Sequence, residues 1–355
     1  MTETKIKSPL ERDYWFDNIK AFLIICVFVG HLANGTFSTT TWWVIALQNF
    51  IYVFHMPAFM VVSGRFAKKR VDRGDWATVV TKMVVPYIIY QTAFLVLFSA
   101  LKATPSKFSY FSPLFGLWYV INVAVYTIAT TYLKKFKWLF PASIVAALAV
   151  GFCLGTLYGG FHRIVCFYPF FLFGYYTAEM KFGFCKKIPF RVICLLMFGA
   201  IGLYVLLNYK YKWNVMSWDL LCMNKTYWYV AKAKSWSLLQ VLDHTILRYI
   251  FGFLGFFMVL GLMPTKKTFF SYVGTHSIYV YVLHCAFIIV LRQLDEQLDL
   301  LRVLTDKWRL LIYCFSGVPL SFILASKPIR KLTGWFISPK FDLSKALRKL
   351  TGIDK

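Results

Sequence analysis

Long apolar stretches recur along almost the whole chain and are separated by short polar segments. Each stretch holds about 20 predominantly apolar residues, the length of an α-helix that crosses the hydrocarbon core of a bilayer. The pattern therefore predicts an all-α polytopic membrane protein, a bundle of ten transmembrane helices in a single membrane domain over residues 1–355. The predicted spans lie near residues 16–35, 43–64, 79–101, 114–132, 139–157, 162–180, 189–207, 244–263, 270–291 and 307–326.

The first predicted span carries ionisable side chains within its apolar run, at Asp17, Lys20 and His31. Such groups are costly in hydrocarbon, so they indicate a functional site. Eleven residues of α-helix turn through about 1100°, within roughly 20° of three full turns, so Lys20 and His31 point the same way. Asp17 lies three residues before Lys20 on the same face. This stripe is predicted to face protein or a water-filled cavity, with Lys20 either paired to Asp17 or lying along the path of a substrate.

The composition excludes the soluble globular class. Hydrophobic residues make up 59% of the chain and aromatic residues 20%, and the mean hydropathy is +0.59. The net charge of +25 does not indicate a nucleic-acid partner, because the basic residues lie in short segments next to the predicted spans. Twenty-five Lys and Arg fall in the alternate segments that include both ends of the chain, and ten fall in the others. The positive-inside rule therefore predicts a multi-pass protein of the cell membrane with both termini in the cytoplasm.

Two segments between or beyond the predicted spans have distinctive compositions. Residues 208–243, on the predicted outer side, contain eight Tyr and Trp residues. Their flat faces either stack against sugar rings or form an interfacial aromatic belt with a surface helix. The tail, residues 327–355, is basic with scattered apolar side chains. It is predicted to lie on the anionic inner leaflet as an amphipathic segment.

Three histidines lie well inside predicted spans. At a rise of 1.5 Å per residue, His31 lies about 24 Å from the inner end of the first span, and His284 about 21 Å from the inner end of the ninth. These two imidazoles are therefore expected at nearly the same level, in the outer half of the membrane. His55 lies about 18 Å from the outer end of its span, nearer to the midplane. Each alone fits a histidine that bonds a carbonyl in the bundle, whereas the coincident depth favours a shared site.

A neutral imidazole in such a place can take a proton from a hydroxyl that attacks an acyl carbon. A metal site is the competing use of several histidines. The chain has no HxxxH or HExxH pair, however, and the predicted spans lack the acidic ligands of a hydrolytic zinc site. Six of the eight cysteines fall within predicted spans and no CxxC pair occurs, so neither a disulfide framework nor a thiolate–metal site is expected.

Short segments of the chain, in order, resemble the acyltransferase 3 family of membrane O-acyltransferases. Lys20 and Gly30-His31 are similar to the family signature of a basic residue followed, after ten residues, by the catalytic His. The other similar segments are FHMPAFMVVSGR at 54–65, LWY at 117–119, FYPFFLFGY at 167–175 and GTHSIYVYVLH at 274–284. Individually these are weak apolar patterns, but jointly they are specific. The first two segments look closest to the branch related to fucose 4-O-acetylases.

The resemblance implies ten helices and an O-acetyltransferase that moves acetyl from cytoplasmic acetyl-CoA, its co-substrate, to a carbohydrate hydroxyl. The acceptor would be a polysaccharide or a lipid-linked glycan. His31 would act as the catalytic base or acyl carrier, supported by His284 and His55. Many members carry an Arg-x-x-Arg pair in the inner part of the third span, where this chain has only Lys82.

The donor is therefore expected on a wider set of residues, most of them basic and able to bind phosphate through charge-assisted hydrogen bonds. They are Lys20, Ser63, Arg65, Lys68, Lys69, Arg70 and Lys82. Most of these basic residues also fit ordinary positive-inside determinants, and Ser63 also fits a cap for a kink at Gly64.

Three residues are expected to bind the acceptor: Asp17, Trp118 and Arg163. Arg163 either stabilises a developing oxyanion or orients the acceptor, or it snorkels to the interface. Two other functions stay open. One keeps the fold with another acyl group or acceptor, such as succinyl or an antibiotic sugar. The other is a proton-coupled transporter with Asp17, Lys20 and His31 as a relay, although no internal repeat of the kind found in many transporters is detected.

Overall fold

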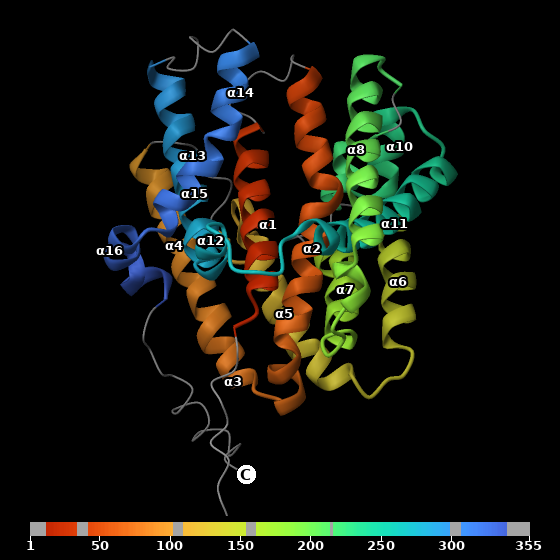
Figure 1. Ribbon diagram of the computed structural model, residues 1–355, viewed down its shortest axis with the longest axis horizontal. Helices are drawn as coiled ribbons and strands as arrows, with labels where there is room; N and C mark the ends of the chain where they lie inside the picture. Colours follow the sequence, from red (N-terminus) through yellow and green to blue (C-terminus); the bar gives the residue numbers. More distant parts are fainter. Residues whose placement is uncertain are drawn as a thin grey trace, which may run out of the picture.

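Helices account for all the regular structure that the computed structural model describes, and the described residues contain no strand (Figure 1). These residues are 12–33, 42–101, 109–153, 161–213, 216–298 and 307–338. Helix satisfies every backbone group within one apolar segment, which the interior of a membrane requires. The predicted all-α class is confirmed.

The helices follow the predicted spans closely in sequence. In chain order they are α1 Tyr14–Ala33, α2 Trp42–Arg73, α3 Trp76–Val79, η1 Val80–Val84, α4 Val85–Ala100, η2 Phe115–Leu117, α5 Trp118–Leu133, α6 Leu139–Ala149, η3 Val150–Phe152, α7 Phe161–Tyr176, η5 Gly183–Lys186, α8 Ile188–Lys210, α9 Trp218–Cys222, α10 Tyr227–Lys234, α11 Leu238–Leu262, α12 Ser271–Thr275, α13 Ser277–Leu298, α14 Lys307–Phe315, α15 Gly317–Ala325 and α16 Lys327–Ile337. Ser237 and Gln240 form a capping box that starts α11, which satisfies two of its free N–H groups.

Seven helices of the described part are long and apolar enough to cross a membrane, so the chain is a multi-pass membrane protein. Three predicted spans are shorter or broken. The fifth contains only the apolar helix Leu139–Phe152, and the sixth contains the 16-residue α7. At the tenth, the segment Leu310–Ala325 meets α16 at an angle of 75°. The number of ten spans stays a prediction.

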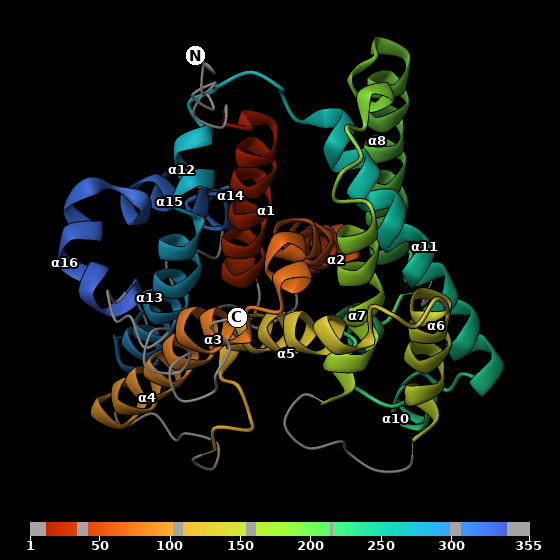
Figure 2. The same cartoon turned by 90° about the horizontal axis from the view of Figure 1, so that it is seen from below.

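Helix α2 forms the centre of the bundle. It is 32 residues long, runs through most of the height of the molecule in Figure 1, and is seen nearly end-on in Figure 2. Helices α1, α5, α7, α8 and α11 all pack against it. Helix α8 lies at the edge with most of its apolar side chains exposed, as expected for a helix that faces lipid.

Two glycines bring α2 and α7 into direct backbone contact. A Cβ atom at Gly64 would lie 1.9 Å from the carbonyl oxygen of Phe171, and one at Gly174 would lie 1.9 Å from that of Val61. Small residues allow helices to approach this closely inside a membrane. The SG and GY motifs of the sequence therefore form the two sides of one helix crossing.

The segments outside the predicted spans contain helices of their own. Residues 208–243 include α9 and α10, and the tail begins with α16, which packs against α4, α13 and α15. The Tyr90 hydroxyl of α4 donates to the carbonyl of Ile337 at the end of α16. Residues 339–355 of the tail lie outside the described residues.

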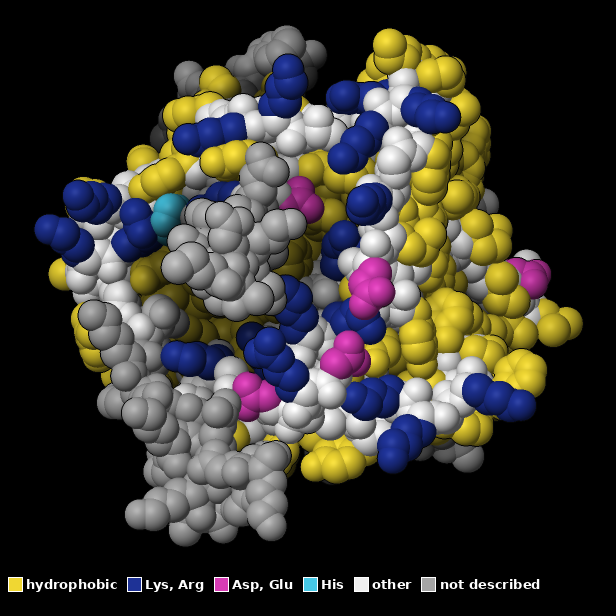
Figure 3. Space-filling model, turned by 60° about the horizontal axis from the view of Figure 1, so that its bottom comes forward, with side chains coloured by type: hydrophobic (Ala, Val, Ile, Leu, Met, Phe, Trp, Pro, Cys, Tyr) yellow, Lys and Arg dark blue, Asp and Glu magenta, His cyan; other side chains and the backbone are white. Residues whose placement is uncertain are grey.

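Lys and Arg side chains surround a hollow on the face shown in Figure 3. The chain places basic residues at this end in the last turns of α2 and in the connections from α5 to α6 and from α7 to α8. A basic face of this kind is typical of the cytoplasmic side of a membrane protein.

Candidate active site

A cavity of about 280 Å³ lies among α1, α2, α5, α7, α9 and α13. Its wall includes His31 from α1, His55 from α2, Trp118 from α5 and Arg163 from α7. Four predicted site residues that are far apart in the sequence are thus brought together. We refer to this space as the histidine cavity.

His31, in the wall of this cavity, lies next to His284 of α13, which is not among the residues that line the wall. Their ring centroids are 5.3 Å apart, and His284 is 0% exposed. The Nδ1 atom of His284 donates to the Val280 carbonyl at 3.0 Å, and that of His55 donates to the Ile51 carbonyl at 2.8 Å. Because a carbonyl oxygen only accepts, both rings carry a proton on Nδ1 and, when neutral, keep a lone pair on Nε2. Each of these two rings, when neutral, can therefore accept a proton at Nε2.

Aromatic rings and a guanidinium complete the wall of the histidine cavity. The Arg163 guanidinium lies 4.9 Å from the centre of the Trp118 ring, and its Nε donates to the Cys222 carbonyl at 3.1 Å. The Trp218 ring lies 4.4 Å from that of Tyr52. Burial raises the pKa of the Cys222 thiol to about 12, so this thiol stays protonated and is a poor nucleophile.

A second cavity, of about 350 Å³, lies along α1, α2, α5 and α13, which also line the histidine cavity. Lys20, Ser63, Arg70 and Lys82 contribute to its wall. Its described lining residues include three cations and no carboxylate, and we refer to it as the basic cavity. Lys82 belongs to the π-helical turn η1, a distortion that is frequent at functional sites.

Asp17 is the centre of an ion cluster at the start of α1. One carboxylate oxygen lies 2.8 Å from Lys20 Nζ and the other 2.6 Å from Arg12 Nε. Arg12 also donates to the Thr275 hydroxyl. The structure thus contains the Asp17–Lys20 ion pair, but it does not bring Asp17 to the wall of either cavity.

Three of the residues predicted to bind the donor lie outside the basic cavity. Arg65 donates to the Thr177 carbonyl at 3.0 Å. Lys68 lies 3.0 Å from a carboxylate oxygen of Asp72 in the same helix and 3.7 Å from one of Glu179, beyond α7. Lys69 is exposed on α2. The contacts of Arg65 and Lys68 join the end of α2 to its surroundings, which fits the reading of these residues as positive-inside determinants.

Sequence reasoning did not single out several residues that line the cavities. Tyr119 and Tyr281 fall in the LWY and GTHSIYVYVLH segments, so their motif position was a signal. Trp218 was one of eight aromatic residues in 208–243, and nothing in the sequence separated it from the others. Tyr52 and Arg292 carried no signal beyond their residue type.

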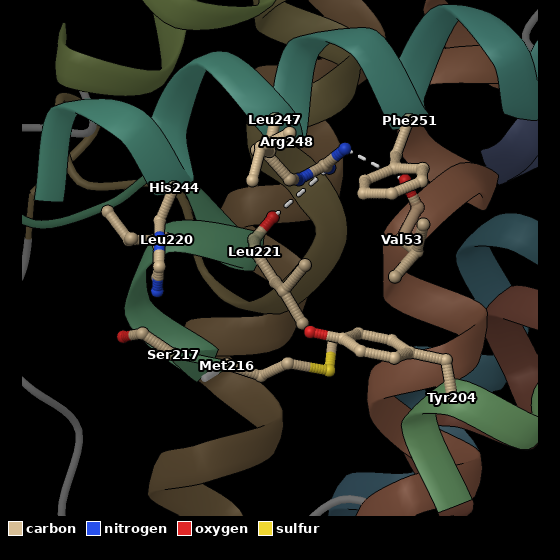
Figure 4. Close-up of a pocket in the computed structure, with 10 residues that line it drawn as sticks. All are labelled: Val53, Tyr204, Met216, Ser217, Leu220, Leu221, His244, Leu247, Arg248 and Phe251. Carbon is tan, nitrogen blue, oxygen red and sulfur yellow. Dashed lines mark hydrogen bonds between the residues drawn. The ribbon is translucent and has the colours of Figure 1, made fainter. Parts of the chain in front are cut away.

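A buried arginine fastens one wall of the histidine cavity. Pro57 lies inside α2 and has no N–H, so the Val53 carbonyl four residues earlier loses its helical partner. Arg248 of α11, 4% exposed, donates from Nη1 to this carbonyl at 2.8 Å and from Nη2 to the Leu221 carbonyl of α9 at 3.3 Å (Figure 4). One guanidinium therefore joins α11 to α9 and to the part of α2 that carries His55.

Replacing Arg248 with Met is expected to destabilise the protein by about 3 kcal/mol, because two buried carbonyls lose a charged donor. The melting temperature in detergent should fall accordingly. The matched control is Ile246→Met, at an exposed position of the same helix, which should change stability by less than about 0.5 kcal/mol. Equal melting temperatures for the two variants would contradict a stabilising role for the Arg248 hydrogen bonds.

Comparison with known proteins identifies one matching family and two similar proteins. Residues 13–326 match the sequence model of a family described as an acyltransferase domain. The chain is similar to nodulation protein NolL of Sinorhizobium fredii, with 28% identity over 184 residues that cover 47% of this chain and 49% of the relative. It is also similar to NolL of Mesorhizobium japonicum, with 27% identity over 185 residues, 47% of this chain and 48% of the relative. The chain thus spans about half the length of these relatives, and no solved structure matches it significantly.

Proposed function

Because this chain belongs to the acyltransferase family whose domain covers residues 13–326, and is an O-acyltransferase, we propose that it is an integral-membrane O-acetyltransferase. It moves an acetyl group from cytoplasmic acetyl-CoA to a hydroxyl of a cell-surface or exported polysaccharide, or of the lipid-linked precursor of such a polysaccharide. The family supports acyl transfer in a membrane, and the two cavities support the choice of donor and the direction of transfer.

The main support for the proposal is that two cavities with different chemical linings lie along the same helices. The basic cavity, with Lys20, Arg70 and Lys82, suits the phosphates of a CoA donor. The histidine cavity suits a hydroxyl that must lose its proton. Helix α1 contributes Lys20 to one and His31 to the other, and these residues are separated by roughly 16 Å of helix. A donor held at Lys20 would direct its acyl end toward His31.

His31 serves in this proposal as the general base. Its neutral imidazole takes the proton of the acceptor hydroxyl while the hydroxyl oxygen bonds to the thioester carbon. The carbon–sulfur bond then breaks, and the imidazolium returns the proton to the CoA thiolate. His284, 5.3 Å away, and His55 support this proton transfer. The alternative role for His31 is that of a carrier, in which the ring nitrogen itself receives the acetyl group and passes it to the acceptor.

Two side chains of the histidine cavity are assigned to the acceptor and a third to the developing oxyanion. Trp118 and Trp218 offer flat apolar faces on which a sugar ring can stack. Arg163, packed on Trp118, provides a positive charge for the oxyanion that develops on the thioester carbonyl. Asp17 is assigned instead to the donor side, where it holds Lys20 in place.

The proposal includes an orientation in the cell membrane, plasma or inner. We assign ten spans, an even number, so both termini lie on the same side of the membrane. The uneven distribution of Lys and Arg between alternate segments supports the cytoplasm as that side. The basic cavity then opens toward cytoplasmic acetyl-CoA. The histidine cavity lies toward the outer leaflet.

The double variant Arg70→Gln/Lys82→Gln is expected to raise the KM for acetyl-CoA by about a hundredfold or more, because each of the two lost charge-assisted hydrogen bonds contributes about 1.5–3 kcal/mol and about 1.4 kcal/mol is a factor of ten. The rate at saturating donor should change much less. The measurement is initial rate against acetyl-CoA concentration with purified protein in vesicles. Lys69→Gln, on the exposed side of α2, is the control, and a KM shift of equal size in that variant would argue against the donor site.

The function as a whole is tested by incubating inverted membrane vesicles with acetyl-CoA labelled in the acetyl group. Label is expected in membrane glycan only when the protein is present, and mild base should release it as acetate. Succinyl-CoA added in excess tests the acyl group, because a succinyltransferase would be inhibited by it far more strongly. Consumption of acetyl-CoA without labelled glycan would contradict a carbohydrate acceptor.

A further inference from the structure

The basic cavity and the histidine cavity lie close together, although the residues that line them differ in chemistry. Their walls use neighbouring positions of the same helices: Trp118 and Tyr119 are consecutive in α5, and Ile278 and Tyr281 are three residues apart in α13. Three residues of α-helix correspond to about 4.5 Å. Met56 of the histidine cavity and Phe59 of the basic cavity are likewise three residues apart in α2. On three of the four shared helices, the histidine cavity therefore begins within one helical turn of the basic cavity.

Aromatic side chains occupy the short distance between the cavities. Tyr119 lines the basic cavity and Tyr281 lines the histidine cavity, and their ring centroids are 5.4 Å apart. Phe59 lies on the basic side, 5.5 Å from the Tyr119 ring. On the other side, the Tyr281 ring lies 6.0 Å from that of His284. A layer of rings thus separates the two spaces and extends to the histidine cluster.

Hydrogen bonds fix both tyrosines in this layer. The Ser63 hydroxyl donates to the Phe59 carbonyl at 2.8 Å, so at the 2.5 Å contact between Ser63 and Tyr119 the phenol is the donor. The Tyr281 hydroxyl donates to the Gly116 carbonyl. Each phenol is therefore held by a different helix or turn.

The layer of rings lies between the proposed donor site and the proposed catalytic histidine, and the inference rests on the proposed acetyl transfer. A thioester delivered from the basic cavity would pass the Tyr119 ring, which lines that cavity and lies 5.4 Å from the Tyr281 ring in the wall of the histidine cavity. Water in the histidine cavity would compete with the sugar hydroxyl for the same carbon, and exclusion of water is how closed sites prevent hydrolysis of reactive acyl groups. We propose that Tyr119 is a specificity-determining residue that admits the donor arm but shields its thioester from water, and so sets the ratio of acetyl transfer to hydrolysis.

Opening the layer should convert part of the transferase activity into a hydrolase activity. In transfer, the acceptor oxygen bonds to the acetyl carbon, the carbon–sulfur bond breaks, and the acceptor's proton passes to CoA. In hydrolysis, water takes the place of the acceptor, and the products are acetate, CoA thiol and a proton. No further reactant is needed.

The test compares Tyr119→Ala with Tyr119→Phe in purified protein in vesicles. CoA thiol released without acceptor is measured beside label transferred to glycan. Tyr119→Ala should raise the ratio of CoA release to acetyl transfer by about tenfold. Tyr119→Phe keeps the ring and should stay close to the native ratio. Tyr132→Ala, at an exposed position of the same helix, is the control for loss of a tyrosine from α5.

The outcomes separate this inference from the proposed function. Native protein that neither transfers acetyl nor releases CoA contradicts the function itself. Native transfer combined with an unchanged ratio in Tyr119→Ala overturns the role of Tyr119. If Tyr119→Ala does not fold, Tyr119→Leu replaces it, since a branched apolar side chain fills part of the space but leaves the layer without its ring. An unchanged ratio in that variant overturns the inference equally.

Discussion

Acetyl transfer should fall by about 10²- to 10⁴-fold when His31 is replaced with Ala, because a positioned general base contributes a factor of this size. The ring lies in the wall of the histidine cavity and next to that of His284, whereas the residues assigned to the donor lie in the basic cavity. The KM for acetyl-CoA should therefore change little while the turnover rate falls, the pattern of a group that acts mainly in the transition state. The measurement is transfer of labelled acetyl to membrane glycan at saturating donor.

His276→Ala is the matched control for this experiment. His276 lies between α12 and α13, donates from Nδ1 to the Tyr272 carbonyl at 2.9 Å, and lines neither cavity. The His276→Ala protein should therefore transfer acetyl at the native rate. Native turnover in a well-folded His31→Ala protein would exclude His31 both as base and as carrier. The two roles are separated by incubation without acceptor, since only a carrier leaves labelled acetyl on the protein, and this label would be absent from His31→Ala.

The proximity of His31 and His284 is the part of the site that the sequence predicted best. Depth along a helix follows directly from the rise per residue, so two residues at similar depth on adjacent helices need only one further condition, that their faces meet. The polar stripe of α1 supplied that condition for His31. The same arithmetic placed Lys20 and Asp17 on one face, and the structure has their ion pair.

The number of spans was harder to predict, because hydropathy reports the preference of side chains for lipid and does not report where a helix ends. The apolar run near 139–157 forms a described helix of only 14 residues, Leu139–Phe152. Near the C-terminus, α15 begins at Gly317 directly after α14 ends at Phe315, and α16 then turns away by 75°. Such breaks depend on packing between helices, which an apolar composition does not encode.

The choice of basic residues at the donor site could not be made from the sequence either. Arg65, Lys68 and Arg70 lie within six positions of α2, yet only Arg70 lines the basic cavity. Successive residues of a helix are rotated by about 100°, so a cluster in the sequence is spread around the helix. The face that meets the cavity is decided by how α2 crosses its neighbours, and that crossing is set where α2 touches α7.

Replacing Gly174 with Ala is therefore expected to have a large effect at a distance from both cavities. The new Cβ atom would lie 1.9 Å from the Val61 carbonyl oxygen, far inside any allowed contact, and α7 would have to move away from α2. Overpacking of this kind costs about 3 kcal/mol or more. We expect a lower melting temperature in detergent and a lower yield of monodisperse protein. Transfer activity should also fall, since α2 carries His55, Ser63 and Arg70.

Gly199→Ala provides the comparison that isolates the crossing from the loss of a glycine. Gly199 also lies within a long apolar helix, α8, but a Cβ atom there would meet nothing within 4 Å, and Ala is favoured over Gly in a helix by about 1 kcal/mol. This variant should be at least as stable as the native protein. If Gly174→Ala and Gly199→Ala had the same melting temperature, the close contact between α2 and α7 would not determine how these two helices cross. If Gly174→Ala is destabilised as expected, Gly64→Ala should be destabilised similarly, because its Cβ would lie 1.9 Å from the Phe171 carbonyl oxygen in the same crossing.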